Sequence, residues 1–408
     1  MEKILKKAIN PLRILINDSR FTGIMLITCT VVSILLANSS GSSAYKALWD
    51  HQFLPQNMPI RVPGSFLGLI NNFMMAFFFL MAGMEIKREL VNGELSSFKK
   101  AVLPFGAALG GMVVPALIFM FFNLHTNYSN GWGIPTATDI AFSVGIASLL
   151  GNRVPVGLKI LLMALAIIDD LGAIVVIALF YGGHINWLFL GLTALIYGGL
   201  LACNYLKVKP GMLQIILSIA LWISLFNSGV EASIAGVLVA FAMPIEVLPR
   251  IEKAIHGYVN FLILPLFALA NTAILLPSSL AGSFDSTLAL GIIAGLVIGK
   301  PVGIFLFSRV LVATKIASLP RNVQWKQLFG MGTLAGIGFT MSIFTTMLAF
   351  GNESFRDIAK VSILTSVVLS LVFSMVYFMV LNVRESIAGH LSEEFAGSPV
   401  GEPVMELN

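Results

Sequence analysis

Long uncharged apolar runs alternate with short polar segments along most of the chain. Each run has about the 20 residues that an α-helix needs to cross a bilayer, and glycine, proline and asparagine mark the turns between runs. The run from Leu171 to Leu206 is too long for one helix, and the turn signal Gly182-Gly183-His184 divides it. The pattern predicts an all-α polytopic membrane protein with twelve transmembrane helices, at about residues 21–38, 64–85, 101–124, 134–150, 158–181, 185–206, 211–227, 230–244, 256–277, 288–308, 328–350 and 360–383.

Lysine and arginine are distributed as this count requires, because cytoplasmic loops of membrane proteins are enriched in them. If the N-terminus is inside, 20 of the 25 basic residues lie in cytoplasmic segments, four lie in outer segments, and Lys300 lies within a span. Both termini are therefore expected in the cytoplasm. The expected parts are a cytoplasmic N-terminal segment (1–20), a twelve-span transmembrane domain (21–383) and a polar cytoplasmic tail (384–408) without regular structure.

Composition supports the membrane assignment. Hydrophobic residues make up 57% of the 408 positions and charged residues only 11%, whereas soluble domains carry about 25% charged residues. The net charge of +5 comes from scattered basic residues, so the clustered basic patch typical of nucleic-acid binding is missing. The first apolar run follows a polar lead of twenty residues, which favours a retained span over a cleaved signal peptide. No sequence feature calls for a cofactor.

The segment between the first and second predicted spans, residues 39–63, is the one long connection outside the membrane. It contains aromatic and proline residues, among them Trp49, Pro55 and Pro59. We expect it to form a small hairpin on the outer side.

Four charged residues fall inside predicted spans: Asp139, Asp169, Asp170 and Lys300. Asp170 lies eleven residues after Lys159 and twelve before Gly182, which places it roughly 16–18 Å from either helix end. A carboxylate at that depth costs about 2.5–3.5 kcal/mol on insertion scales, and such residues usually mark ion or proton pathways.

Adjacent helical positions point about 100° apart, so Asp169 and Asp170 cannot face the same spot. We expect one to face a water-filled funnel and the other a neighbouring helix, where Lys300 is the basic partner at that depth. A purely structural ion pair explains one aspartate with Lys300 and leaves a surplus of buried acid.

Two of the predicted spans contain helix-breaking residues. Pro135 precedes Thr138 and Asp139 in IPTATDIAFS, and proline removes a backbone donor. Gly336 and Gly338 interrupt TLAGIGFTMSIF. Interrupted spans at corresponding places in two halves point to an inverted-repeat transporter with its site near the midplane.

Helix ends that meet at such a crossing carry opposite partial charges. Asp139 is therefore expected to offset the positive ends and Lys300 the negative ends.

Several long motifs resemble the NhaA sodium–proton antiporter family. They are GMEIKREL (83–90), ATDIAFSVGIASLLGNRVPVGLKILLMALAIIDDLGAI (137–174), SGVEASIAGV (228–237), FLILPLFALANT (261–272), GLVIGKPVGI (295–304) and GIGFTMSIF (336–344). The resemblance implies the inverted-repeat NhaA fold, with discontinuous spans four and eleven crossing at the midplane.

By this resemblance, Asp170 is the principal sodium ligand, with Asp169 beside it in the sodium site. Asp169 is also implied to exchange a salt bridge with Lys300. Thr138 and Asp139 match the hydroxyl and acidic pair at the broken helix.

Glu85, Arg88 and Glu252 match charges that the family has at its cytoplasmic funnel and links to pH regulation, although charged residues at helix ends are also often merely solvated. Residues 39–63 correspond to the family's dimerisation hairpin. Glu231 stands where the family often has a histidine, and Asn72 where some members have an acid.

The expected activity is exchange of cytoplasmic Na⁺ or Li⁺ for external H⁺ across a bacterial inner membrane, by a homodimer surrounded by lipid. Carboxylates bind either a hard cation or a proton, and two acids would exchange two protons for one sodium. A passive cation channel, a transporter of another substrate and an intramembrane aspartyl protease are the alternatives. An asymmetric acid cluster at broken helices suits a transporter better than the symmetric rings typical of channels, and the protease alternative leaves Lys300 without a role, so no enzyme is expected.

Overall fold

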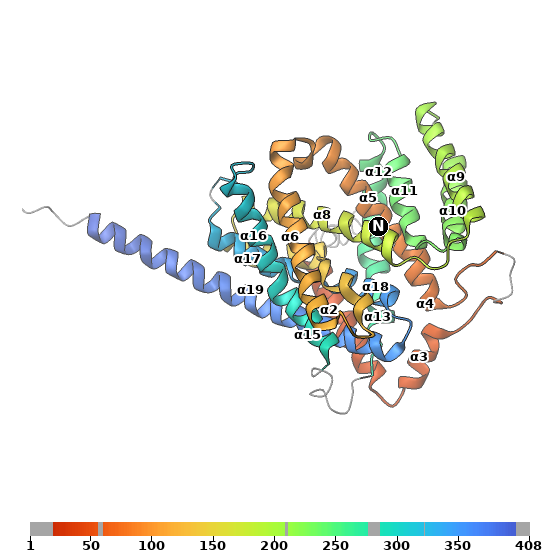
Figure 1. The fold of residues 1–408 in the computed structure, drawn as a ribbon, viewed down its shortest axis with the longest axis horizontal. Coiled ribbons are helices and arrows are strands. Elements are labelled where there is room, and N and C mark those ends of the chain that lie inside the picture. Colours follow the sequence, from red (N-terminus) through yellow and green to blue (C-terminus); the bar gives the residue numbers. More distant parts are fainter. Residues whose placement is uncertain (1–18, 56–59, 209–210, 276–285, 322, 397–408) are drawn as a thin grey trace, which may run out of the picture.

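The computed structural model describes residues 19–55, 60–208, 211–275, 286–321 and 323–396. These residues are almost entirely helical (Figure 1). The first half contains α2 (Ser19–Ala37), α3 (Ser42–Asp50), α4 (Phe66–Gly68), η1 (Leu69–Met74), α5 (Met75–Asn92), η2 (Glu94–Ser96), α6 (Phe98–Asn123), η3 (Ser129–Thr136), α7 (Ile140–Leu149), η4 (Gly151–Arg153), α8 (Val156–Phe180) and α9 (Trp187–Tyr205). The second half contains α10 (Met212–Ser228), η5 (Ala232–Ile234), α11 (Ala235–Ala242), α12 (Leu248–Tyr258), η6 (Val259–Ile263), α13 (Leu264–Asn271), α15 (Thr287–Ala294), η7 (Gly295–Gly299), α16 (Lys300–Ala313), α17 (Trp325–Ala335), α18 (Phe339–Ala349) and α19 (Glu353–Ala396).

The helices are those of a polytopic membrane protein. Within the described residues, seven helices are long and apolar enough to cross a membrane, and two bent pairs raise the number to nine. Two shorter apolar helices, α10 and Ala232–Ala242, accompany them. Each predicted span coincides with at least one helix, and the number twelve stays a prediction.

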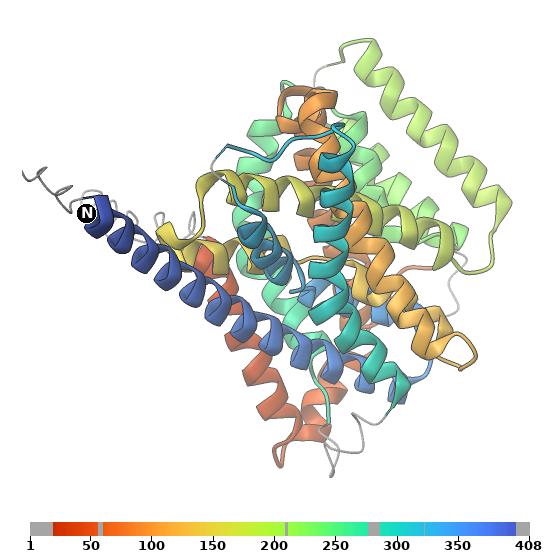
Figure 2. The same cartoon turned by 60° about the vertical axis from the view of Figure 1, so that its left-hand side comes forward.

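Of two expectations about the segments outside the spans, one holds only in part and the other is wrong. Residues 42–50 form the helix α3, bent by 116° from α2, and the single β bridge among the described residues joins Gln52 to Ser65. The expected hairpin is borne out in part: the bridge is antiparallel and the Phe53 N–H donates to the Gly64 carbonyl at 2.8 Å, but residues 42–50 are helical and residues 56–59 lie outside the described part. The tail is not irregular either, because α19 continues to Ala396 and extends away from the body of the molecule (Figures 1 and 2). Residues 1–18 and 397–408 lie outside the described chain.

Helix α8 occupies the centre of the bundle. Of its apolar window 67% is buried, against 11% for α9, which stands beside α10 at the edge of the molecule (Figure 2). This helix carries Asp169 and Asp170, and both carboxylates lie in the protein interior.

Three of the long helices contain a π-helical turn: η1 before α5, η6 before α13 and η7 before α16. Pro265 and Pro301 follow the second and third of these turns directly. Because proline lacks an N–H and its ring clashes with the carbonyl four residues earlier, the wider π turn lets each helix continue past its proline. Such turns often occur at functional sites, and Lys300 stands at the end of one of them.

Candidate functional site

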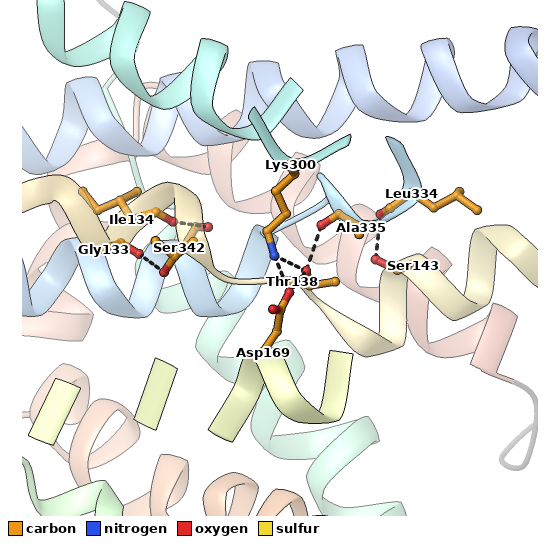
Figure 3. A network of polar contacts seen from close by, with 10 residues as sticks. Gly133, Ile134, Thr138, Ser143, Asp169, Lys300, Leu334, Ala335 and Ser342 are labelled. Carbon is orange, nitrogen blue, oxygen red and sulfur yellow. Dashed lines mark hydrogen bonds and ion pairs between the residues drawn. The ribbon is translucent and has the colours of Figure 1, made fainter. Parts of the chain in front are cut away.

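Two broken helices meet in the middle of the molecule. Residues 137–139 separate η3 from α7, and residues 336–338 separate α17 from α18, which are bent by 49°. The Asp139 N–H donates to the Ile337 carbonyl across the two breaks at 2.7 Å. Hydroxyl groups continue the contact on both sides, because Ser143 donates to the Leu334 carbonyl at 2.9 Å and Ser342 to the Ile134 carbonyl at 2.8 Å (Figure 3). The backbone groups freed by each break are thus satisfied by the other broken helix.

Asp139 caps two helices at once. One carboxylate oxygen accepts from the Phe142 N–H at the start of α7, 3.1 Å away. The other accepts from the N–H and the hydroxyl of Thr340, at 3.0 and 2.6 Å, in the first turn of α18. A negative charge is favourable at helix N-termini, so the expectation that Asp139 offsets the two positive ends is confirmed.

Lys300 and Asp169 form an ion pair that is fully buried. The Lys300 Nζ also contacts the Thr138 hydroxyl, which lies 2.6 Å from Asp169 Oδ2 and 2.9 Å from the Ala335 carbonyl (Figure 3). A hydroxyl has one proton, so Thr138 donates to Asp169 or to Ala335 but not to both. The Thr138 hydroxyl links the Lys300 ammonium to the Ala335 carbonyl at the C-terminal end of α17, and the expectation that Lys300 offsets the negative helix ends stays a prediction.

Asp170 faces a cavity of about 260 Å³, whereas Asp169 does not line it. Thr138, Asp139 and Thr340 line the same end of the cavity. Asp170 Oδ1 is buried without a hydrogen-bond partner in the described part of the molecule. The expected division is confirmed: one carboxylate faces a cavity and the other faces a neighbouring helix.

The other end of the cavity is charged. Arg88 Nη1 donates to both carboxylate oxygens of Glu252 at 2.7 Å and lies on the same helix as Glu85, whose carboxylate is 4.0 Å from Arg88 Nη2. Glu85 and Glu252 line the cavity together with His256 and Asn260. The three charged residues singled out from the sequence are thus brought together, and two of them, Glu85 and Glu252, line the cavity that Asp170 also lines.

Sequence reasoning missed four residues of the site. Thr340 and Ser342 hold the two broken helices together, and His256 and Asn260 line the cavity. The spacing of Glu252, His256 and Asn260 by four residues, one face of a helix, was the available signal for the second pair.

The residues expected at the helix breaks have different roles. Pro135 lies inside η3, before the break rather than within it. Gly336 and Gly338 have ordinary negative φ angles, −66° and −104°. Glycine is therefore needed there for lack of space for a side chain and not for its backbone conformation. A Cβ at Gly338 would lie 2.8 Å from the Ala137 carbonyl oxygen, and one at Gly336 would lie 2.5 Å from the Leu296 carbonyl oxygen.

Two residues noted as departures from the family lie away from the cavity lining. Glu231 accepts from the N–H and hydroxyl of Ser233, at 3.4 and 3.2 Å, and so caps η5. The Asn72 amide donates to the Gly68 carbonyl within its own helix.

A resident metal site would need several ligands in one place. Within the described ranges no three His, Cys, Asp or Glu residues are grouped closely enough to hold a metal ion. Of the two aspartates expected to bind Na⁺, only Asp170 faces the cavity in this arrangement, because Asp169 is paired with Lys300.

Comparison with known proteins points to one family. The sequence model described as Na⁺/H⁺ antiporter 1 matches residues 13–378. The chain is 45% identical over 376 residues to Na(+)/H(+) antiporter NhaA 1 of Clostridium beijerinckii, covering 90% of this chain and 94% of that protein. It is 42% identical to the Na(+)/H(+) antiporter NhaA of Cytophaga hutchinsonii (93% and 97% covered) and 44% identical to that of Escherichia coli O1:K1 / APEC (85% and 92% covered).

Proposed function

Because the chain belongs to the Na⁺/H⁺ antiporter 1 family, we propose that it exchanges cytoplasmic Na⁺ or Li⁺ for external H⁺ by alternating access, with Asp170 as the principal ion-binding residue. The observation that carries this proposal is that the buried Asp170 carboxylate lines the cavity while its oxygen Oδ1 has no hydrogen-bond partner among the described residues. A carboxylate left without a partner in the protein interior is costly, and binding either a proton or a cation removes that cost.

Exchange follows from competition at one site. Na⁺ is a hard cation that favours oxygen ligands, and Asp170, Thr138 and Asp139 supply carboxylate and hydroxyl oxygens at one end of the cavity. A proton on Asp170 excludes the cation and a bound cation excludes the proton, so the two fluxes are coupled without further machinery.

Asp169 and Lys300 give the site a second exchangeable charge. When a cation enters beside Asp170, it competes with the Lys300 ammonium for Asp169, and the ion pair opens. Asp169 then becomes a sodium ligand and Lys300 can release a proton. Two protons would exchange for one sodium, and each cycle would carry one net positive charge inward.

The broken helices provide the movable part. Hydrogen bonds across the breaks join η3–α7 to α17–α18, with Asp139 capping both α7 and α18. Gly336 and Gly338 allow the close contact of the two segments, and Pro135 lies in the 3₁₀ turn before the first break. A displacement of these paired segments would carry the ion-binding oxygens with it and change the side from which Asp170 is reached.

The cluster of Glu85, Arg88 and Glu252 is proposed to regulate exchange by pH. It stands at the mouth through which ions would enter from the cytoplasm. Protonation of its acids at low pH would weaken their hold on Arg88 and leave a positive charge that repels cations.

The cellular setting completes the proposal. The chain would cross the bacterial inner membrane twelve times in the NhaA fold, with discontinuous spans four and eleven, both termini in the cytoplasm and lipid around it. It would work as a homodimer through residues 39–63, and act neither as an enzyme nor on nucleic acid.

The test is ion exchange in proteoliposomes. A pH gradient is imposed, NaCl, LiCl or KCl is added, and the internal pH is followed for the wild type, Asp170→Asn and the exposed control Asp50→Asn. We expect Na⁺ and Li⁺ to collapse the gradient with wild type and Asp50→Asn, and Asp170→Asn to be silent. Cation flux without proton movement in the wild type would instead indicate a channel, and collapse by K⁺ a different substrate.

A further inference from the structure

Four basic residues follow one another around the connection between α16 and α17. Arg309 belongs to α16, Lys315 and Arg321 to the connection, and Lys326 to the first turn of α17, and all four are exposed. They are named here the basic patch. Residues 286–352 contain no acidic residue, and none of the four forms an ion pair within the ranges that the structure describes.

Basic residues on α5 and at the start of α6 are arranged differently, because they have acidic partners. Arg88 lies 2.7 Å from Glu252, and Lys100 lies 3.3 Å from Glu94. The charge of the basic patch, in contrast, is not neutralised by the described part of the protein. A negatively charged partner would therefore meet four cations and no competing acid among these residues.

Arg309 has a fixed position within the patch. Its guanidinium carbon lies 4.6 Å from the centre of the Trp325 ring at the start of α17. Phe305, one turn earlier on α16, contacts the same indole edge-on, with ring centroids 5.8 Å apart. A guanidinium stacked on an aromatic face keeps the N–H groups at its rim available. Enrichment of cytoplasmic loops in basic residues explains the charge of the patch, but it does not explain this arrangement.

Arg309 also lies at the depth of lipid headgroups. Asp169 stands in the middle of α8, so its partner Lys300 is near the midplane of the membrane. Arg309 follows Lys300 by nine residues on one helix, which is about 13 Å along the axis, and half of the hydrocarbon core is about 15 Å thick. Tryptophan is enriched at this boundary, and Trp325 occupies it here.

An exposed apolar strip runs along the helix between the levels of Lys300 and Arg309. Its members Ile298, Leu306 and Val310 are 57%, 49% and 60% exposed. Residues three apart on a helix share one face, so Leu306 and Arg309 lie on the same side of α16. An acyl chain that follows this strip would place its headgroup at the guanidinium.

A phospholipid headgroup matches this site in its chemistry. Arginine binds phosphate oxygens through two parallel charge-assisted hydrogen bonds. Basic residues at the membrane surface attract anionic lipids in particular. A nucleic acid or an acidic protein would also be attracted by the charge, but neither has an apolar part for the exposed strip at Leu306. A lipid accounts for the charge and the strip together.

We propose that Arg309, stacked on Trp325, binds the phosphate of an anionic phospholipid whose acyl chain lies along α16, while the rest of the basic patch strengthens the attraction. Only the choice of the cytoplasmic leaflet rests on the proposed function. The lipid contacts α16, which begins at Lys300, and α17, which ends at the second helix break. It therefore holds together two helices that carry the ion site.

Quenching by brominated lipids tests this site directly. Trp325 is kept as the sole tryptophan, with the other four replaced by phenylalanine. The protein is reconstituted in phosphatidylcholine with increasing fractions of brominated phosphatidylglycerol or brominated phosphatidylcholine. We expect brominated phosphatidylglycerol to quench at a several-fold lower mole fraction. One basic residue near the surface contributes about fivefold to such a preference, so Arg309→Gln should lower it by about fivefold or more.

The matched control is Arg250→Gln, which removes an exposed arginine from α12, outside the basic patch, and should keep the preference. A second protein with Trp187 as its sole tryptophan, 75% exposed on α9, should show no preference. Equal quenching of Trp325 by the two lipids, or an equal loss in both arginine variants, overturns the site. Loss of the preference in an excess of inorganic phosphate would mean that a free anion binds there, which also overturns the proposal.

Thermal unfolding in detergent is the second measurement, for the case that the single-tryptophan proteins do not fold. Phosphatidylglycerol should raise the unfolding temperature of the wild type and of Arg250→Gln more than phosphatidylcholine does, and Arg309→Gln should lose this difference. Equal shifts in the wild type overturn the proposal. If the lipid preference is found but the wild type shows no sodium–proton exchange, the proposed function fails and the lipid site stands. Exchange without the lipid preference has the opposite meaning.

Discussion

At the scale of single residues, Asp169 and Asp170 have opposite surroundings although they are adjacent in sequence. Each has one buried oxygen without a hydrogen-bond partner among the described residues, but Asp169 is paired with Lys300 and the Thr138 hydroxyl, whereas Asp170 lines the cavity. The 100° rotation between neighbouring helical positions, about what an ideal helix gives, accounts for this division. The Asp170 carboxylate is available to an entering ion, while the Asp169 carboxylate is occupied by its ion pair with Lys300.

The buried ion pair predicts a characteristic pattern of stability. Lys300→Met leaves Asp169 buried and unpaired, and loss of one partner of such a pair costs about 3–5 kcal/mol. The double variant Lys300→Met, Asp169→Asn removes both charges and should unfold at a higher temperature in detergent than Lys300→Met alone. Equal or greater destabilisation of the double variant would show that Asp169 does not depend on Lys300.

Thr138 provides a second test at this scale. Thr138→Val keeps the shape and removes the hydroxyl that contacts Asp169, Lys300 and the Ala335 carbonyl. Loss of a hydrogen bond to a charged group is worth about 1.5–3 kcal/mol, so the apparent KM for Na⁺ should rise by about tenfold or more. Thr345→Val, which removes a hydroxyl bonded only within α18, is the control and should leave KM unchanged.

At the scale of elements, the two broken helices act as one unit. Their interrupted backbones satisfy each other, and Asp139 caps one helix of each pair. Glycine is needed where the segments pass because a side chain would collide with backbone, and not because the backbone has a left-handed conformation. The close packing of the two broken helices at these glycines therefore sets the position of Asp139 and of the other site residues at the breaks.

Gly338→Ala tests this contact. A Cβ there would lie 2.4 Å from the Ser342 hydroxyl and 2.8 Å from the Ala137 carbonyl oxygen, and overpacking typically costs about 1–3 kcal/mol. We expect a lower unfolding temperature and loss of exchange. Gly351→Ala, where the added Cβ meets nothing within 4 Å, should match the wild type. If Gly338→Ala kept normal activity, exchange would not depend on the close contact between the segments at Gly338 and Ala137.

At the scale of the whole molecule, one cavity brings together the carboxylates of Glu85 and Glu252 and the buried carboxylate of Asp170. Arg88, which is paired with Glu252, adds a positive charge to this group. A proton or cation bound at Asp170 therefore shares its cavity with the charges that are proposed to regulate exchange.

Voltage dependence is the prediction that belongs to the whole molecule. If two protons exchange for one sodium, an inside-negative potential of 100 mV, worth about 2.3 kcal/mol per charge, would drive sodium out without a pH gradient. Because about 1.4 kcal/mol corresponds to a factor of ten, the sodium ratio should approach roughly 50. Vesicles with a valinomycin-clamped potential and buffered pH measure it. A ratio that stays at one would mean that one proton exchanges for one sodium.

The sequence alone was enough to predict how deep the charged residues lie in the membrane and where along the chain two of the helices are interrupted. Charged residues are rare in apolar runs because each one carries a free-energy cost in the membrane interior. For this reason the sequence alone singles out Asp139, Asp169, Asp170 and Lys300. The same rule identified a membrane protein and the approximate helices. It failed for residues 42–50 and for α19 beyond the last span, where hydropathy does not distinguish a polar helix from a loop.

Only the tertiary structure decided which groups meet. The contact of Thr340 with Asp139 and the contact of Ser342 with the Ile134 carbonyl join helices that are distant in sequence. The salt bridge between Asp169 and Lys300, by contrast, was already implied by the family resemblance. Period and composition determine which face of a helix is apolar and how deep a charge lies. They do not determine the partner, because helix packing in lipid is set by close fit and hydrogen bonds between helices, and these exist only once the whole bundle has assembled.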